Sequence, residues 1–168
     1  ALNWYSSNPF QGDYTEEYQS FYHEELIKQL FTRKYMWATH VWNMFDFGAD
    51  ARAEGGENGQ NHKGLVTFDR QIKKDSFYLY KAYWSDEKFF HLVGERYNLR
   101  KIGEQSFRVY SNCDKVTLKV GSKQKTVTAE GIFEFDGLTI KEGENKVTIT
   151  ATSTRSPGSP IDLPTTLG

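Results

Sequence analysis

The chain has 168 residues and is 38% apolar, which is enough to bury one ordinary hydrophobic core or two small ones. Its 21 basic and 22 acidic residues nearly cancel, so no long-range field favours nucleic acid or an anionic membrane as a partner. No apolar run approaches the roughly 18 residues that a membrane-spanning helix needs, and the start lacks a basic-then-apolar secretory pattern. Because residue 1 need not be the natural N-terminus, the missing secretory pattern says nothing about localisation.

Aromatic residues make up an unusual 15% of the chain and are crowded into residues 1–110. Aromatic rings fill hydrophobic cores, and they also offer flat apolar faces to the C–H faces of sugars. Composition alone does not separate these two uses. The single cysteine, Cys113, cannot form an internal disulfide, and with no basic or histidine neighbour it is expected to be a buried thiol.

A helix is expected from about Tyr14 to Arg33. Asp13 and Thr15 offer N-caps, and two acidic residues follow in the first turn, as helix starts prefer. Apolar residues at helical spacing predict one strongly apolar face, formed by Tyr18, Tyr22, Leu26 and Leu30 and widened by Phe21, Ile27 and Phe31. Such a face must pack against something.

The next segment, Tyr35–Phe45, is nearly continuous in apolar and aromatic residues, which indicates a strand buried on both faces, as in a parallel sheet. A long loop over Gly48–Gly64 follows, rich in Gly, Asn and Glu and of a kind that carries function. A short strand is then expected at Leu65–Phe68, and a second helix from about residue 75 to Trp84.

One buried strand and two helices cannot close a sheet by themselves. We therefore expect residues 1–84 to be a fragment of an α/β fold, with the size of the last one and a half repeats of an eight-stranded α/β barrel.

From Glu87 onward the pattern changes to short alternating runs separated by turns that are rich in Gly and Asn. The expected strands are Phe89–Val93, Phe107–Ser111, Val116–Val120, Thr126–Ala129, Ile132–Phe135, Leu138–Ile140 and Lys146–Ala151. Short strands at this spacing predict an all-β, immunoglobulin-like sandwich over residues 85–168. Its Pro/Ser/Thr-rich tail, Ser156–Pro160 above all, is expected to be a linker or a frayed end.

Three runs of sequence resemble bacterial glycoside hydrolase family 2 β-galactosidases: Trp37–Asp50 (WATHVWNMFDFGAD), Asn61–Arg70 (NHKGLVTFDR) and Lys74–Trp84 (KDSFYLYKAYW). The resemblance continues through Val109–Asn112. It implies a longer enzyme in which a sugar-binding-like sandwich, an immunoglobulin-like domain and a (β/α)₈ TIM barrel precede the region seen here. In that scheme Tyr35–Phe45 is barrel strand eight, and the localisation stays open between bacterial cytoplasm and periplasm.

The resemblance also implies hydrolysis of terminal β-galactosides with retention, by a glutamic acid/base and a glutamate nucleophile that both precede residue 1. Retention needs two carboxyl groups only about 5–5.5 Å apart. The glutamates of the first helix are expected to be solvated or capping. Asp46 and Asp69 are expected to be structural, Asp46 as a hydrogen-bond acceptor in a loop and Asp69 paired with Arg70 or a backbone amide. The chain alone is therefore expected to be inactive, with no catalytic residue of its own.

Trp42 is the first candidate sugar contact, because function in such barrels lies at the carboxyl ends of the strands. Pattern alone favours a core tryptophan, whereas the resemblance places a substrate-contacting one at this position. Asn61 and Lys63 alternate, so in an extended chain both would present polar groups to one side. A glucuronidase uses a similar Asn-x-Lys pattern on the uronate carboxylate, so a β-glucuronidase is the alternative, although the flanking sequence resembles galactosidases more.

No metal or cofactor is expected. The four histidines lack close ligand spacing, and the glycines at residues 55–59 lack the Gly-Lys-Ser/Thr ending of a phosphate loop. The expected ligand is a β-galactoside bound by the full-length enzyme. A noncatalytic carbohydrate-binding or interaction module is the remaining alternative. Because an unclosed strand and an apolar helix face would expose much apolar surface, self-association through residues 1–84 is also expected.

Overall fold

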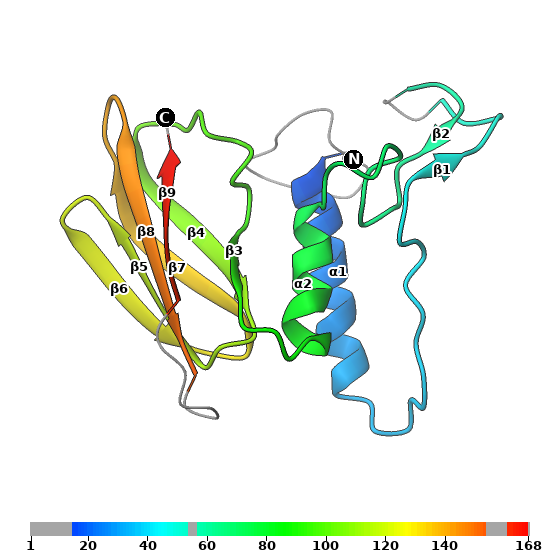
Figure 1. The fold of residues 1–168 in the computed structure, drawn as a ribbon, viewed down its shortest axis with the longest axis horizontal. Coiled ribbons are helices and arrows are strands. Elements are labelled where there is room, and N and C mark those ends of the chain that lie inside the picture. The colour runs from blue at the N-terminus through cyan, green and yellow to red at the C-terminus, as the bar shows by residue number, and fades with distance from the viewer. Residues whose placement is uncertain (1–14, 54–56, 154–160, 168) are drawn as a thin grey trace. The chain divides into compact units, whose positions relative to one another are not determined.

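The computed structural model describes residues 15–53, 57–153 and 161–167. Internal contacts divide the chain into two units, Ala1–Phe77 and Tyr78–Gly168. Figure 1 shows the two helices and the small sheets that the described residues form. The domain boundary that the sequence predicts, between residues 84 and 85, stays a prediction.

The first helix, α1, runs from Glu16 to Phe31, which confirms the sequence prediction. Thr15 is its N-cap, and the Thr15 hydroxyl accepts a hydrogen bond from the Tyr18 amide at 3.2 Å. The buried face, however, is not the predicted apolar one. The buried residues of α1 are Glu16, Ser20, His23, Glu24 and Ile27.

The predicted apolar face of α1 is only partly buried: Ile27 is 1% exposed, whereas Tyr22 is 53% exposed and Phe31 is 56% exposed. Hydrogen bonds made by polar residues of α1 account for this orientation of the helix. The Glu16 carboxylate accepts a hydrogen bond from the Asp75 amide at 2.6 Å, and Gln19 accepts one from the Ser76 hydroxyl at 3.2 Å. These bonds turn the polar side of α1 toward the start of the second helix.

Burial of His23 makes stability depend on pH. The side chain is 6% exposed, and this burial lowers its pKa from 6.5 to about 4. The unfolded chain therefore takes up a proton near pH 6.5 and the folded chain only near pH 4. The free energy of unfolding should fall as the pH drops through this window, by about 3 kcal/mol at the acid end.

Urea titrations at several pH values between 4 and 7 measure this loss. The His23→Gln variant, which has no titrating group at this position, should show a flatter pH dependence than the native chain. Equal slopes for the two proteins would contradict the assignment.

The predicted strand at Tyr35–Phe45 is wrong, because these residues form no regular strand and Trp37 is 95% exposed. Pairing begins only at the end of the segment, where the Val66 amide donates to the Met44 carbonyl at 3.0 Å and Phe45 forms a parallel bridge with Val66. A strand buried on both faces needs neighbouring strands and covering layers. The described part of the first unit supplies one short neighbour.

The loop that follows is largely irregular, as predicted, and a two-residue antiparallel ladder closes it: β1 (Phe47–Gly48) pairs with β2 (Gln60–Asn61). The predicted strand at Leu65–Phe68 is present only as isolated bridges of Val66. The second helix, α2, runs from Asp75 to Trp84, as predicted.

The second unit contains two antiparallel sheets (Figure 1). One sheet has the order β3 (Phe90–Leu92), β4 (Gly103–Ser111), β7 (Gly131–Ile140), and the other has β6 (Lys123–Thr128), β5 (Lys115–Val120), β8 (Asn145–Thr152), β9 (Ile161–Leu167). This division into three and four strands is also that of a constant-type immunoglobulin sandwich. The sequence prediction missed β9, and the predicted linker at Ser156–Pro160 lies outside the described residues.

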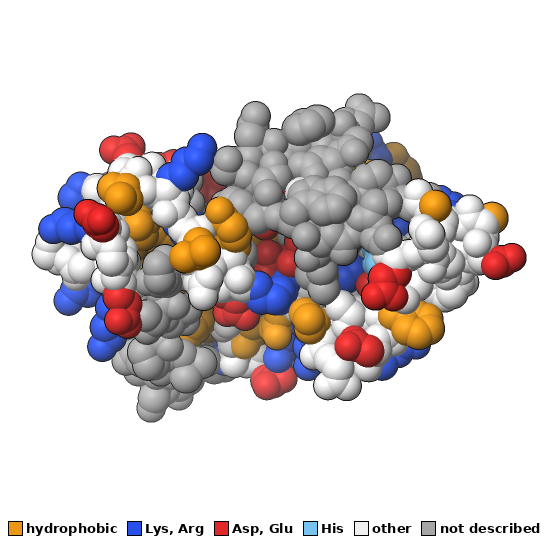
Figure 2. Space-filling model, turned by 90° about the horizontal axis from the view of Figure 1, so that it is seen from above, with side chains coloured by type: hydrophobic (Ala, Val, Ile, Leu, Met, Phe, Trp, Pro, Cys, Tyr) orange, Lys and Arg blue, Asp and Glu red, His pale blue; other side chains and the backbone are white. Residues whose placement is uncertain are grey.

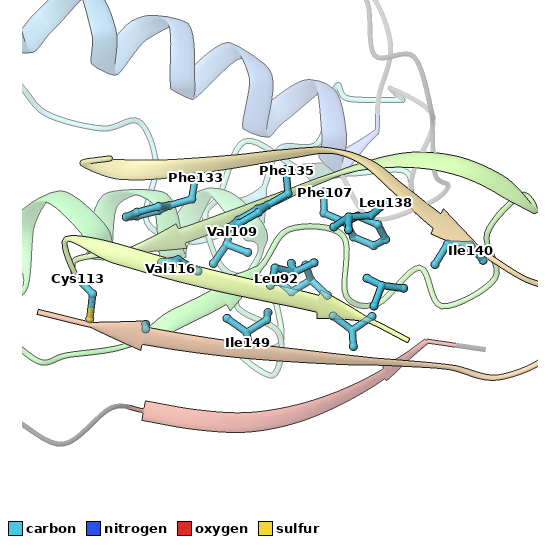
Figure 3. Close-up of a cluster of buried hydrophobic side chains, with 14 residues drawn as sticks. Leu92, Phe107, Val109, Cys113, Val116, Phe133, Phe135, Leu138, Ile140 and Ile149 are labelled. Atoms are coloured by element: carbon cyan, nitrogen blue, oxygen red, sulfur yellow. The ribbon is translucent and has the colours of Figure 1, made fainter. Parts of the chain in front are cut away.

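A single hydrophobic core joins the two sheets. Figure 3 shows Phe133, Phe135 and Phe107 of one sheet directed toward Val116 and Ile149 of the other. Alternate residues of each strand supply this core because successive side chains of a strand point to opposite faces. Cys113 is a buried free thiol at the edge of the same cluster, as predicted.

Two predicted strands, Ile132–Phe135 and Leu138–Ile140, form the single strand β7. Phe107 pairs with Phe135 and Gln105 pairs with Leu138, so β7 carries one extra residue between these pairs. Gly137 lies in this bulge with φ +70°, a conformation that favours glycine. The glycine that suggested a turn therefore marks a bulge within a continuous strand.

Candidate functional site

A hollow of about 370 Å³ opens in the first unit, where three separate segments meet. Its lining residues are Asp46, Glu57, Gln60, His62, Thr67, Phe68 and Asp69. They come from the end of the irregular aromatic segment, from the long loop with β2, and from the turn that precedes α2. This hollow adjoins the Asn61-x-Lys63 pattern that the sequence singles out.

The lining residue Asp46 belongs to a buried ion pair. Asp46 is 2% exposed and Lys74 is fully buried, and the Lys74 ammonium donates to Asp46 Oδ1 at 2.8 Å. The same Oδ1 accepts the Gly64 amide at 2.8 Å, and Lys74 Nζ also donates to the His62 carbonyl at 3.1 Å. Asp46 is thus a hydrogen-bond acceptor within the structure, as predicted.

Sequence reasoning missed Lys74. A lysine next to a helix start is ordinarily expected in solvent, and only an acidic partner distant in the sequence, here Asp46, allows its complete burial. The residue that signals the partner, Asp46, is already conspicuous at the end of an apolar run.

Asn61 and Lys63 lie in different environments. Asn61 is 2% exposed, and its Oδ1 accepts the Lys63 amide at 3.0 Å, whereas the Lys63 side chain is exposed. The Asn61 amide therefore shapes the local backbone, and the Lys63 ammonium is available to a ligand. The assignment of both residues to a substrate stays a prediction.

Trp42 is 71% exposed, and its ring packs edge-on against Phe47 with centroids 6.0 Å apart. The peptide bond between Trp42 and Asn43 is cis. An exposed indole is available for stacking on a sugar. Trp42 is not among the described residues that line the hollow, and its role as a sugar contact stays a prediction.

Arg70 follows the lining residue Asp69 and adopts a conformation that the sequence does not foresee. It has φ +68°, and its guanidinium lies 4.1 Å from the centroid of the Phe45 ring. The guanidinium also donates to the carbonyls of Asp46 and Thr67. No local sequence pattern predicts a positive φ at an arginine. The contacts that stabilise this conformation of Arg70 are with distant residues or with carbonyls of the same turn.

Asp69 accepts hydrogen bonds from the Thr67 hydroxyl and, at 3.1 Å, from the Gln71 amide. These two bonds lower the pKa of Asp69 below its ordinary value, with the Thr67 bond contributing most. The predicted pairing with a backbone amide is confirmed. At His62, burial lowers the pKa and the nearby Asp46 carboxylate opposes this, so the imidazole favours its neutral form at pH 7.

A second hollow, of about 470 Å³, lies in the sandwich unit. The Asn112 carboxamide donates to the carbonyls of Ser85 and Glu87 at its rim, at 2.7 and 2.9 Å. Within residues 15–53, 57–153 and 161–167 no three His, Cys, Asp or Glu side chains are placed to share a metal ion. The same residues contain no helix with the length and apolarity required to cross a membrane.

The surface charge of this molecule is mixed. On the face drawn in Figure 2, acidic and basic side chains are interspersed with hydrophobic ones. This agrees with the formal net charge of −1 and shows no wide area of one sign on that face. This face therefore offers no long-range field of one sign that would steer a charged ligand.

The described residues that line the hollow are polar apart from Phe68. The comparisons with known proteins are more specific about the class of protein. No family model matches the chain. A curated β-glucuronidase from Bacteroides fragilis is 41% identical over 140 residues, which cover 80% of this chain and 20% of that protein. The chain thus spans about a fifth of that relative's length.

Comparison with solved structures also finds glycosidases. An FMN-binding β-glucuronidase from Faecalibacterium prausnitzii L2-6 is 43% identical with a TM-score of 0.89, over 99% of this chain and 25% of that one. A putative β-galactosidase from Bacteroides fragilis is 28% identical with a TM-score of 0.82, over 97% of this chain and 24% of that one. The chain is thus similar to a segment of glycosidases that include both β-glucuronidases and a putative β-galactosidase, and the similarity does not single out β-galactosidases.

A substitution at Gly64 tests whether close packing against the Asp46 backbone constrains the site. A Cβ at this position would lie 2.0 Å from the Asp46 backbone nitrogen and 2.2 Å from the Phe45 carbonyl carbon, which cannot move independently of the chain. The Gly64→Ala variant should lose about 1–3 kcal/mol of unfolding free energy through overpacking. Chemical denaturation measures the loss.

Gly48→Ala is the matched control in the same unit, because nothing lies within 4 Å of the position that an added Cβ would take there. It should change stability by only a few tenths of a kcal/mol. Equal losses in the two variants would show that the close approach of Gly64 to Asp46 does not constrain the site.

Proposed function

We propose that this chain forms part of the sugar-binding side of a β-glucuronidase of glycoside hydrolase family 2. The observation that carries the proposal is the exposed side chain of Lys63. The backbone on either side of it is fixed by hydrogen bonds to Asp46 and Lys74. Support comes from two β-glucuronidases that are 41% and 43% identical to the chain. The chain spans a quarter or less of their length, so the reacting carboxyl groups are proposed to come from the rest of such an enzyme.

The proposed chemistry follows from residue types. An ammonium binds a uronate carboxylate through charge-assisted hydrogen bonds, and the exposed face of Trp42 offers an apolar wall to a sugar ring. Retaining hydrolysis would require two further carboxyl groups about 5–5.5 Å apart. In this scheme residues 1–84 complete the end of a TIM barrel, and residues 85–168 form an immunoglobulin-like domain that supports it.

A β-galactosidase is the second candidate. It is favoured by the Trp37–Asp50 run and by the similarity to a putative β-galactosidase at 28% identity. A galactoside has a neutral hydroxymethyl group where a glucuronide has a carboxylate, so Lys63 would gain less from binding it. The two candidates therefore differ in what they predict for this one side chain.

The test replaces the corresponding quarter of the Faecalibacterium prausnitzii β-glucuronidase with this chain. The chimera should hydrolyse nitrophenyl β-glucuronide in preference to nitrophenyl β-galactoside. Lys63→Ala should raise KM for the glucuronide by roughly 10-fold or more, with a smaller effect on kcat, because it removes a charged contact. Lys119→Ala, at an exposed lysine of the sandwich, should leave both constants unchanged.

Preference of the folded chimera for the galactoside would favour the second candidate. The 168-residue chain by itself should turn over neither substrate, and calorimetric titration with glucuronate or galactose should show no binding. Binding by the chain alone would instead support a noncatalytic carbohydrate-binding module.

We also propose self-association of the isolated chain through residues 1–84. The support is a set of exposed large apolar side chains in this region: Tyr22, Phe31, Tyr35, Trp37 and Trp42, each more than half exposed. Monomers rarely expose apolar patches of large area. Sedimentation equilibrium should show dimers or larger species, and the Tyr35→Ser/Trp37→Ser variant should shift the chain toward monomer. A native chain that stays monomeric at high concentration would contradict this.

A further inference from the structure

We infer that the Asp46–Lys74 ion pair is a positioning device that holds Lys63 for a charged sugar and thereby favours a uronide over a sugar without a carboxylate. The inference rests on the proposed function and deepens it. Neither residue is assigned a contact with the sugar. Both act through the backbone on either side of Lys63.

The first argument is the complete tethering of residues 62–64. Lys74 Nζ holds the His62 carbonyl, Asn61 Oδ1 holds the Lys63 amide, Asp46 Oδ1 holds the Gly64 amide, and Gln19 Nε2 donates to the Gly64 carbonyl at 3.1 Å and the Lys63 carbonyl at 3.4 Å. Three of these four tethering side chains are at most 2% exposed. The backbone of Lys63 is therefore fixed from both sides, whereas its side chain remains exposed.

The second argument is that a buried ion pair occupies a position that apolar residues could fill without loss of stability. Burying an ion pair is energetically expensive, and replacing one by well-packed apolar residues is often neutral or stabilising. The pair here does something an apolar pair cannot: its oxygen and its ammonium each bind one backbone group next to Lys63. The close approach at Gly64, where no Cβ fits, brings that amide within reach of Asp46.

The third argument concerns entropy. Lysine carries a compact ammonium on a flexible stem, so binding a carboxylate restricts several rotatable bonds. A backbone that is already fixed removes part of that loss, and small displacements of a charged contact have large kinetic effects. Loosening residues 62–64 should therefore weaken binding of a carboxylate-bearing sugar and leave a neutral sugar almost unaffected.

Two double variants separate hydrogen bonding from charge. Asp46→Asn/Lys74→Gln removes both charges but keeps an acceptor for the Gly64 amide and a donor for the His62 carbonyl. Asp46→Leu/Lys74→Met has the same net charge and similar volume but has neither group. The control, Glu25→Gln/Lys28→Met, removes the exposed ion pair on α1, in which Lys28 Nζ lies 2.7 Å from Glu25 Oε1.

The measurement is the kcat/KM for nitrophenyl β-glucuronide divided by that for nitrophenyl β-galactoside, in the chimera described above. Asp46→Leu/Lys74→Met should lower this ratio by roughly 10-fold or more through KM for the glucuronide, the size typical of residues that orient a binding group. Asp46→Asn/Lys74→Gln should recover most of the ratio. The Glu25 and Lys28 control should leave it unchanged.

A folded Asp46→Leu/Lys74→Met chimera that keeps the native ratio overturns the inference. If circular dichroism shows that this variant is unfolded, Gln19→Leu decides instead. It removes the tethers from the Lys63 and Gly64 carbonyls, together with the hydrogen bond from Ser76, and leaves the ion pair in place. An unchanged ratio again overturns the inference. A native chimera without preference for the glucuronide contradicts the proposed function itself. Hydrogen exchange in the 168-residue chain gives an independent readout, with faster exchange of the Lys63 and Gly64 amides expected in the Leu/Met variant.

Discussion

The Asp46 carboxylate organises the first unit, because one of its oxygens binds both a buried ammonium and a backbone amide. An unpaired charge at that depth would destabilise the fold by several kcal/mol, so Asp46 and Lys74 require each other. Their hydrogen bonds connect three segments: the end of the aromatic segment, the end of the long loop and the residue before α2. The shape of the hollow and the backbone position of Lys63 depend on these contacts.

The sandwich unit is stabilised differently. Its strands alternate inward apolar and outward polar residues, and a dry core joins the two sheets without a buried ion pair among its members. The pairing of β4 with β7 shifts register at the bulge that contains Gly137, where the extra residue of β7 is accommodated with a positive φ. The first unit differs in exposing polar groups and aromatic side chains, among them Lys63 and Trp42.

The chain is similar to glycosidases that act on different sugars. β-Glucuronidases and a putative β-galactosidase share this fold with the chain. Their sugars differ in the configuration at C4 and at C6, which bears a carboxylate in a glucuronide and a hydroxymethyl group in a galactoside. A fixed ammonium distinguishes these two groups more strongly than any apolar wall, because an apolar contact is nearly equal for both.

The sequence by itself determined both helices, the buried thiol and most strands of the sandwich, since these follow from local propensity and from periods of 3.6 and 2. It offered Asp13 and Thr15 as helix caps, and the structure selects Thr15. It also singled out Asp46 as a structural acceptor. Only the tertiary structure decided that Tyr35–Phe45 is irregular and exposed, that α1 buries a polar face, and that Lys74 lies inside. Those outcomes depend on partners far apart in the sequence, and no local pattern of residues encodes which partner a segment will find.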